Sequence, residues 1–198
     1  MTTARTDTSP ASRTAPAPAE VAKAAELEGD ALAVLHPEHG GREFATALVN
    51  AELFQDAVRF VAHALPKREA VWWALLCARE AAGDAPPAEV KASLDATDVW
   101  VRHPGDEQRR AAMVAAQKAT FKTAAGCAGL AAFLSGGSLS VPGQPEVPPG
   151  PFLTAKAVFG AVALASIGTD PKTAPERFRR YVEQGLHIGD QAGAWRKA

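Results

Sequence analysis

Two adjacent tryptophans, Trp72 and Trp73, are the most conspicuous side chains that could take part in binding. Two large rings about 100° apart on a helix cannot face the same neighbour, so one of them could line a groove for a ligand. Leu75, Leu76 and Cys77 follow closely and are apolar. This composition favours an interpretation in which both rings pack between different helices, with a ligand-facing tryptophan as the alternative.

Charged and imidazole side chains form a second group around a Pro-Gly turn: Asp98, Arg102, His103, Asp106, Glu107, Arg109 and Arg110. Such a group could bind an anion or a carboxylate. However, Asp98 and Arg102 have the i,i+4 spacing of an ordinary helical ion pair. Asp106 and Arg110 have the same spacing, and acids suit the first turn of a helix because of its dipole. We therefore favour a structural role for this group.

Charges border the tryptophan segment, with Arg68 and Glu69 before it and Arg79 and Glu80 after it. A partly buried Arg–Glu pair that reaches the turn carrying Arg109 would explain why charged residues lie next to such an apolar run. The candidate binding residues are therefore Trp72, Trp73, Trp100, Arg68, Glu69, Arg102, Arg109 and Arg110.

The other reactive residue types do not form a recognisable catalytic or metal-binding pattern. His36 and His39 are separated by Pro37, which prevents a regular helical turn, and no second ligand pair of matching spacing follows. Cys77 and Cys127 lie in apolar runs, as small buried thiols commonly do. We predict no catalytic residue, no cofactor and no metal site. The pattern leans away from an enzyme but does not decide the question.

The overall charge gives no reason to expect a nucleic acid or an anionic membrane as partner. Lys+Arg number 21 against Asp+Glu 22, for a net charge of −1, so the sequence has no basic footprint. No hydrophobic block follows Arg5 and Arg13, as a secretory signal would require. Gly136 and Pro142 interrupt the longest charge-free stretch before it reaches about 20 apolar residues. We expect a cytoplasmic protein without a membrane helix.

The chain divides into an N-terminal tail and a single helical domain. Residues 1–19 contain no large apolar side chain after Met1, so ordering them would bury nothing, and we predict disorder there. Residues 20–198 form the domain. Apolar residues that recur every three or four positions predict helices at 20–36, 47–65, 67–82, from the prolines at 86–87 to about 102, 106–134 with a break near Lys122, 154–166, and from 173 onward.

A Pro/Gly-rich segment at 135–151 separates the later helices, and its composition favours an extended polyproline-like loop. Thr173 and Glu176 match a capping box at the start of the last helix. No segment alternates apolar and polar residues as a strand does. The predicted fold is all-α: a compact array of about six to eight antiparallel helices, as an irregular bundle or as HEAT-like hairpins.

Three segments resemble a bacterial family of helical proteins with no assigned function. They are 65–79 (LPKREAVWWALLCAR), 100–104 (WVRHP) and 107–112 (EQRRAA), and the similarity continues through 132–138 (AFLSGGS) and the Pro/Gly-rich loop to the last helices. The resemblance implies a bacterial cytoplasmic setting and a link to type VI secretion genes. It brings no catalytic residues.

Two functions from different classes remain open. The favoured one is a protein-interaction or scaffold module whose first candidate contact surface is the loop from Val141 to Pro151, because a preformed extended segment loses little entropy on docking. A solvated linker is the alternative role of this loop. The competing function is a small-molecule binding protein or enzyme, with a concave and partly polar pocket around Trp72, Trp73, Trp100 and residues 102–110. The oligomeric state is not predicted.

Overall fold

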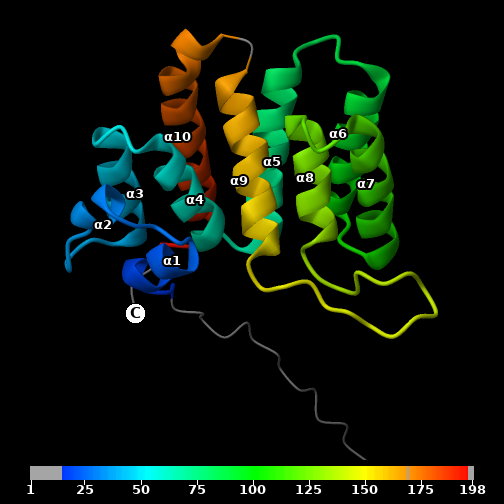
Figure 1. The fold of residues 1–198 in the computed structure, drawn as a ribbon, viewed down its shortest axis with the longest axis horizontal. Helices are drawn as coiled ribbons and strands as arrows, with labels where there is room; N and C mark the ends of the chain where they lie inside the picture. Colours follow the sequence, from blue (N-terminus) through cyan, green and yellow to red (C-terminus); the bar gives the residue numbers. More distant parts are fainter. Residues whose placement is uncertain (1–14, 169, 196–198) are drawn as a thin grey trace, which may run out of the picture.

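Ten α-helices and one 3-10 helix make up the regular structure of the described residues, 15–168 and 170–195, in the computed structural model (Figure 1). The described part of the chain contains no strand, so the prediction of an all-α fold is confirmed. The helices are α1 (Pro18–Ala24), α2 (Asp30–Ala33), α3 (Gly41–Asn50), α4 (Phe54–Ala64), α5 (Lys67–Ala82), α6 (Ala88–Arg102), α7 (Asp106–Ala119), α8 (Ala124–Phe133), α9 (Leu153–Ile167), the 3-10 helix η1 (Pro171–Thr173) and α10 (Ala174–Ala192).

Most of the segment predicted to be a disordered tail lies outside the described residues. Residues 15–17 are described and have no helix or strand, and α1 begins at Pro18, inside the predicted tail. A proline suits the first turn of a helix, where its missing N–H is not needed.

The helix predicted at 20–36 is wrong, because the chain turns after α1. Glu26 and Gly29 adopt positive φ angles of 55° and 52°, which end α1 and restart the chain as the short helix α2. As a result Leu27 is buried, whereas Leu32 is 45% exposed.

The long helix predicted at 47–65 is also wrong, because α3 and α4 are separate. Glu52 adopts a φ of 61°, and the backbone N–H of Leu53 donates to the carbonyl of Leu48. Leu48 and Val58, on either side of the break, are both fully buried. The apolar spacing therefore continues across a turn in the backbone. The breaks after α1 and after α3 together explain why the structure has more helices than the sequence predicts.

Other predicted element boundaries agree with the structure. Helix α5 spans the predicted residues 67–82, and the expected break near Lys122 lies between α7 and α8, where Thr123 caps α8 by accepting from the N–H of Gly126. The capping box at Thr173 is wrong. Its hydroxyl donates to the carbonyl of Asp170 and accepts from Arg177 instead of capping α10.

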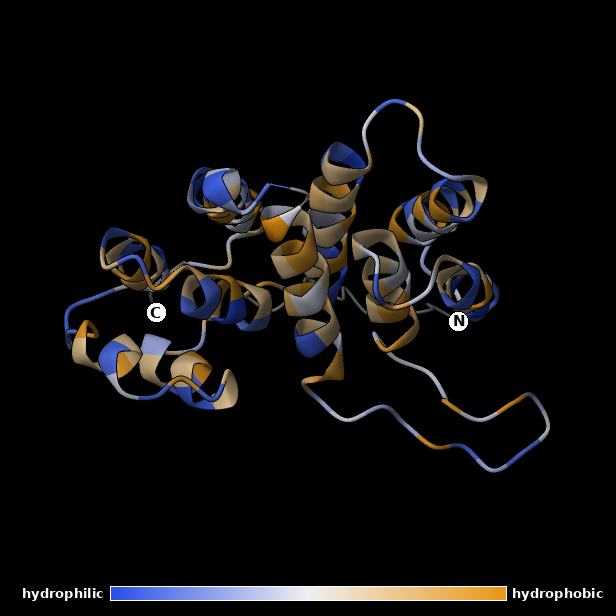
Figure 2. Ribbon diagram, turned by 45° about the horizontal axis from the view of Figure 1, so that its top comes forward, coloured by the Kyte–Doolittle hydropathy of each residue, from blue (hydrophilic) through white to orange (hydrophobic). Residues whose placement is uncertain are grey.

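Helix α9 lies in the middle of the array and packs against α4, α5, α8 and α10, so one continuous core joins the early and late helices. Figure 2 shows the central helices coloured as hydrophobic along most of their length, while the outer helices mix both kinds. Helices α7 and α8 approach closely through small residues: a Cβ on Gly129 would lie 2.9 Å from the Cβ of Ala116.

No single helix among the described residues is long and apolar enough to cross a bilayer. The segments Leu153–Ile167 and Pro171–Ala192 are long and apolar enough for a bilayer only when taken together, and a bend of 116° separates them.

Candidate functional site

Trp73 lies in the core. Its side chain is fully buried, and its indole Nε1 donates to the carbonyl of Tyr181 at 2.8 Å, which ties α5 to α10. A Cβ on Gly185 would lie only 2.8 Å from this ring, so a glycine is what lets α10 come so close. Trp100 is also buried. Neither ring is available to a ligand.

Trp72 is partly exposed and faces a shallow depression of about 450 Å³ between the start of α5, the end of α6 and the end of α10. Arg68 donates through Nε to the carbonyl of Val101 at 2.7 Å, and Arg102 forms an ion pair with Asp98 at 2.9 Å. The lining residues are Arg68, Glu69, Trp72, Asp98, Val101, Arg102, Ile188, Gln191 and Ala192.

The structure thus gathers only half of the predicted binding residues. Arg68, Glu69, Trp72 and Arg102 line this depression. Trp73 and Trp100 do not line it, because they belong to the core, and Arg109 and Arg110 lie at the base of the Pro/Gly-rich loop. Ile188 and Gln191 come from the last helix, and no spacing in the sequence links them to the tryptophans.

The predicted bridge from an Arg–Glu pair to the Arg109 turn is wrong. Arg109 and Arg110 both pair with Asp106, at 2.5 Å and 2.7 Å. Arg79 pairs with Asp98 on α6 at 3.4 Å. The two guanidinium groups hold the pKa of the Asp106 carboxyl below its usual range, chiefly through the hydrogen bonds from Arg110 and Arg109.

Arg109 fixes the start of the Pro/Gly-rich loop. Its guanidinium is buried, stacks over the ring of Phe133 at 4.6 Å, and donates to the carbonyls of Phe133 and Ser138 at 2.7 Å and 2.9 Å. Gly137 adopts a φ of 62° directly over this guanidinium, where a Cβ would lie 2.9 Å from Nη2. The sequence places Arg109 among the candidate binding residues and does not predict this role, because nothing in its spacing indicates that a distant loop covers it.

The loop itself is held by a few hydrogen bonds and then projects from the bundle (Figure 1). The N–H of Leu139 donates to the carbonyl of Val147 at 2.8 Å, and the Ser138 hydroxyl accepts from the N–H groups of Ser140 and Val147. At the tip, the N–H of Gln144 donates to the carbonyl of Val141 and closes a turn. The base is therefore fixed while the projecting part stays open to solvent.

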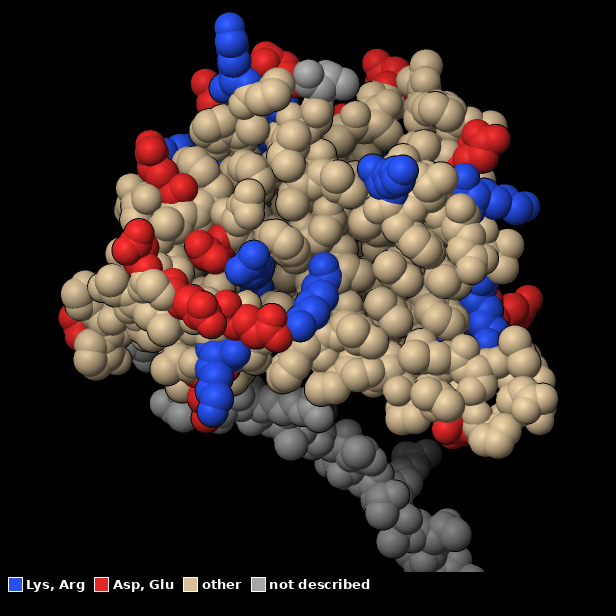
Figure 3. All heavy atoms as spheres, viewed as in Figure 1, with Lys and Arg blue, Asp and Glu red and all other residues tan. Residues whose placement is uncertain are grey.

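The projecting part presents apolar side chains and almost no charge. Val141 is 65% exposed and Val147 is 50% exposed, and Leu139 and Phe152 are exposed at its two ends. Glu146 is the only charged residue between 135 and 151. Figure 3 shows this region at the lower right as uncharged apart from one acidic spot.

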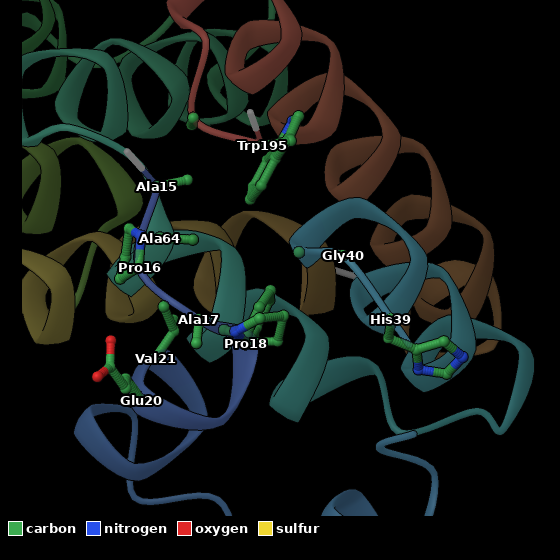
Figure 4. A pocket seen from close by; sticks show the side chains of 13 residues that line it. Ala15, Pro16, Ala17, Pro18, Glu20, Val21, His39, Gly40, Ala64 and Trp195 are labelled. Carbon is green, nitrogen blue, oxygen red and sulfur yellow. The ribbon is translucent and has the colours of Figure 1, made fainter. Parts of the chain in front are cut away.

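A larger hollow of about 550 Å³ lies where the two ends of the described chain meet (Figure 4). Residues 15–18, the segment 39–41 and Ala64 line it, and the indole of Trp195 points into it, whereas the ring of His39 is directed away. Trp195 donates through Nε1 to the carbonyl of Leu186 at 3.0 Å and lies against Gly41 and Gly189. Its lining offers few polar groups, and the sequence did not indicate it.

The cysteines and histidines show no arrangement for catalysis or metal binding. Burial raises the pKa of the Cys77 thiol well above its ordinary value and also raises the pKa of the Cys127 thiol. The N–H of His36 donates to Nδ1 of His39 at 3.3 Å. No three His, Cys, Asp or Glu side chains among the described residues are placed to share a metal ion.

The fold and this surface define an all-helical protein that carries an anchored and exposed Pro/Gly-rich loop. The chain belongs to a family of unknown function, DUF6931, which matches residues 44–189. The match includes the whole loop and every residue that lines the Trp72 depression except Gln191 and Ala192. A search of the curated proteins and a search of the solved structures each gave no significant match.

Proposed function

We propose that this protein is a protein-interaction module whose contact segment is the loop between Leu139 and Pro151. The observation that carries the proposal is the contrast between the two parts of the loop: a base held by a buried arginine, and a projecting segment with exposed apolar side chains and one charge. Apolar groups displayed in this way are typical of binding sites for other proteins.

The anchor at Arg109 argues against a simple linker. Taking a guanidinium out of water is unfavourable unless it is paired and hydrogen-bonded, and hydrogen bonds to a charged group contribute about 1.5–3 kcal/mol each. Here the acid of Asp106, the carbonyl of Phe133 at the end of α8 and the loop carbonyl of Ser138 satisfy the buried group. A linker needs no fixed base, whereas a docking segment benefits because less conformational entropy remains to be lost on binding.

The proposed setting is a bacterial cytoplasm, and the proposed partner is another protein rather than a nucleic acid or a membrane. The near-neutral net charge of −1 supports this choice of partner. A role as an accessory to a secretion system comes only from the family resemblance of the sequence, and it is part of the proposal.

Affinity purification of the tagged full-length chain from its native host tests the proposal. Three forms are compared: the wild type, a variant with residues 139–149 replaced by Gly and Ser at equal length, and Val114→Ser. Val114 is the control because it is an apolar residue, 55% exposed on α7, that is not part of the loop. We expect one stoichiometric partner with the wild type and with Val114→Ser. Retention of that partner by the loop variant would refute the proposal.

The depression at Trp72 supports a second candidate function, the binding of a small molecule. An aromatic face beside Arg68 and Arg102 suits a ligand that combines an apolar part with a carboxylate or phosphate. Native mass spectrometry of the purified chain should then show a retained molecule that is lost in Trp72→Ala. The control is Val99→Ala, because Val99 is exposed on α6 but does not line the depression. If the wild type and both variants all show only the mass of the polypeptide itself, no molecule is retained and this candidate is contradicted.

A further inference from the structure

Prolines recur every third residue along the loop, at Pro142, Pro145, Pro148 and Pro151. A polyproline II helix has three residues per turn, so residues three apart lie on the same edge. Pro149 breaks the pattern and belongs to a different edge. Pro142 and Pro151 lie in turns at the two ends, so the spacing places Pro145 and Pro148 in one row along the extended segment between them. A row of prolines is a pattern that an aromatic groove can bind.

The backbone between 144 and 150 has little choice of conformation. Pro145, Pro148 and Pro149 have φ fixed near −65°. Gln144, Val147 and Gly150 each precede a proline, which disfavours the helical region for them. Only Glu146 is free of both restrictions. The structure agrees, since none of the residues 145–150 belongs to a helix, strand or turn. The extended form is thus present before any partner binds.

The hydrogen-bonding groups of this segment suit binding in a groove that donates hydrogen bonds better than pairing with a strand of the partner. Its prolines have no N–H, and the N–H groups of Gln144 and Val147 already donate to Val141 and to the hydroxyl of Ser138. A partner that added a strand would need donors on this segment, and few remain. Among the described residues, no hydrogen bond uses the carbonyls of Pro145 and Pro148, so acceptors are in excess.

The fold also determines which part of the segment faces outward. Val147 is held through its backbone to Ser138 and Leu139, so the edge that contains it is fixed against the other arm of the loop. In a three-fold helix, Pro145 and Pro148 lie on another edge. Both are exposed, and no charge lies between them on their own edge.

We propose that the partner recognises this loop as a polyproline II helix. The partner would carry a groove of Trp and Tyr side chains, against which Pro145 and Pro148 pack and whose ring N–H or hydroxyl groups donate to the free carbonyls. This inference rests on the proposed function and specifies the chemistry of the partner.

The test repeats the capture from the native host with two further full-length forms, Pro145→Ala/Pro148→Ala and Pro149→Ala. The second is the matched control, because it makes the same chemical change on another edge. The captured protein, purified, is then titrated against each form by biolayer interferometry. We expect Pro145→Ala/Pro148→Ala to weaken binding by about tenfold or more and Pro149→Ala to leave it within about twofold. Far-ultraviolet circular dichroism should show equal helix content in all forms.

The outcomes separate this inference from the proposed function. A partner that is lost with the Gly/Ser loop but is equally affected by both proline variants, or by neither, overturns polyproline recognition and leaves the loop as the contact segment. A partner that tolerates the Gly/Ser loop, or no partner at all, contradicts both. Only a loss confined to Pro145→Ala/Pro148→Ala supports the inference.

Discussion

Trp72 and Trp73 are neighbours in the chain but have opposite surroundings, and this difference can be measured. Because Trp73 is fully buried, Trp73→Ala should lower the free energy of unfolding by about 3–5 kcal/mol. Trp72→Ala should cost clearly less, because that ring is partly exposed. Denaturant titration followed by circular dichroism gives both values. Equal losses would show that Trp72 is also a core residue.

Tyr181 carries a buried hydroxyl that has no partner of good hydrogen-bond geometry among the described residues, although the Arg180 guanidinium lies beside it. Burial raises its pKa to about 12, so the group is neutral at any ordinary pH. An unpaired buried hydroxyl costs about 1–3 kcal/mol, and Tyr181→Phe removes this cost together with a few van der Waals contacts. We expect Tyr181→Phe to raise the free energy of unfolding by roughly 1 kcal/mol in the same titration. A clear loss of stability would mean that the hydroxyl has a partner in solution.

At the scale of elements, two helical glycines differ in what surrounds them. A Cβ on Gly185 would lie 2.8 Å from Trp73 and 2.9 Å from Val61, so Gly185→Ala should be destabilising by about 1–3 kcal/mol through overpacking. A Cβ on Gly160 of α9 would meet only the Cys127 sulfur, at 3.6 Å. Gly160→Ala should therefore raise the melting temperature, because alanine favours a helix by about 1 kcal/mol over glycine. Shifts of the same sign in thermal melts would contradict this account.

The sequence predicted elements well where proline and glycine mark their ends, and poorly where they do not. Helix α5 follows Pro66 and ends before Gly83, and both signals are local. The break after α1 depends on positive φ angles at Glu26 and Gly29, and the break after α3 depends on one at Glu52. Gly29 is a local signal that the apolar spacing outweighed in the prediction, whereas glutamate has no preference for that conformation, so tertiary packing decides the turn at Glu52.

Only the part of the candidate site that lies within one helix was predicted from the sequence. Arg68 and Trp72 are one helical turn apart, so their common face follows from local geometry. Their contact with the end of α10 depends on how helices distant in sequence pack. Arg109 shows the same limit, since the loop that covers it begins more than twenty residues later.

At the scale of the whole molecule, His63 links stability to pH. It lies on α4 beside the ring of Phe152, with 5.7 Å between the ring centroids. Its Nδ1 donates to the carbonyl of Arg59 at 2.8 Å, and its buried Nε2 has no partner among the described residues. Burial lowers its pKa below the ordinary value of 6.5. The hydrogen bond to the Arg59 carbonyl and the charge of Glu26 oppose this lowering, whereas the charges of Lys156 and Arg59 add to it.

The unfolded chain therefore binds more protons than the folded chain as the pH falls below 6.5. The contribution of neutral His63 to stability is complete above that pH and is lost as the pH falls toward the folded-state pKa. We expect the wild type to lose more unfolding free energy between about pH 7.5 and 5.5 than His63→Gln does. Parallel losses, measured by denaturant titration at both pH values, would show that His63 does not contribute.

The sparse charge of the Pro/Gly-rich loop has a practical result for protease mapping. No lysine or arginine occurs between Lys122 and Lys156, so trypsin has no cleavage site within the loop and its digestion pattern reports only on the rest of the chain. A glutamate-specific protease can cut there only after Glu146. Cleavage at this one bond is therefore a footprint of whether a bound protein covers the loop.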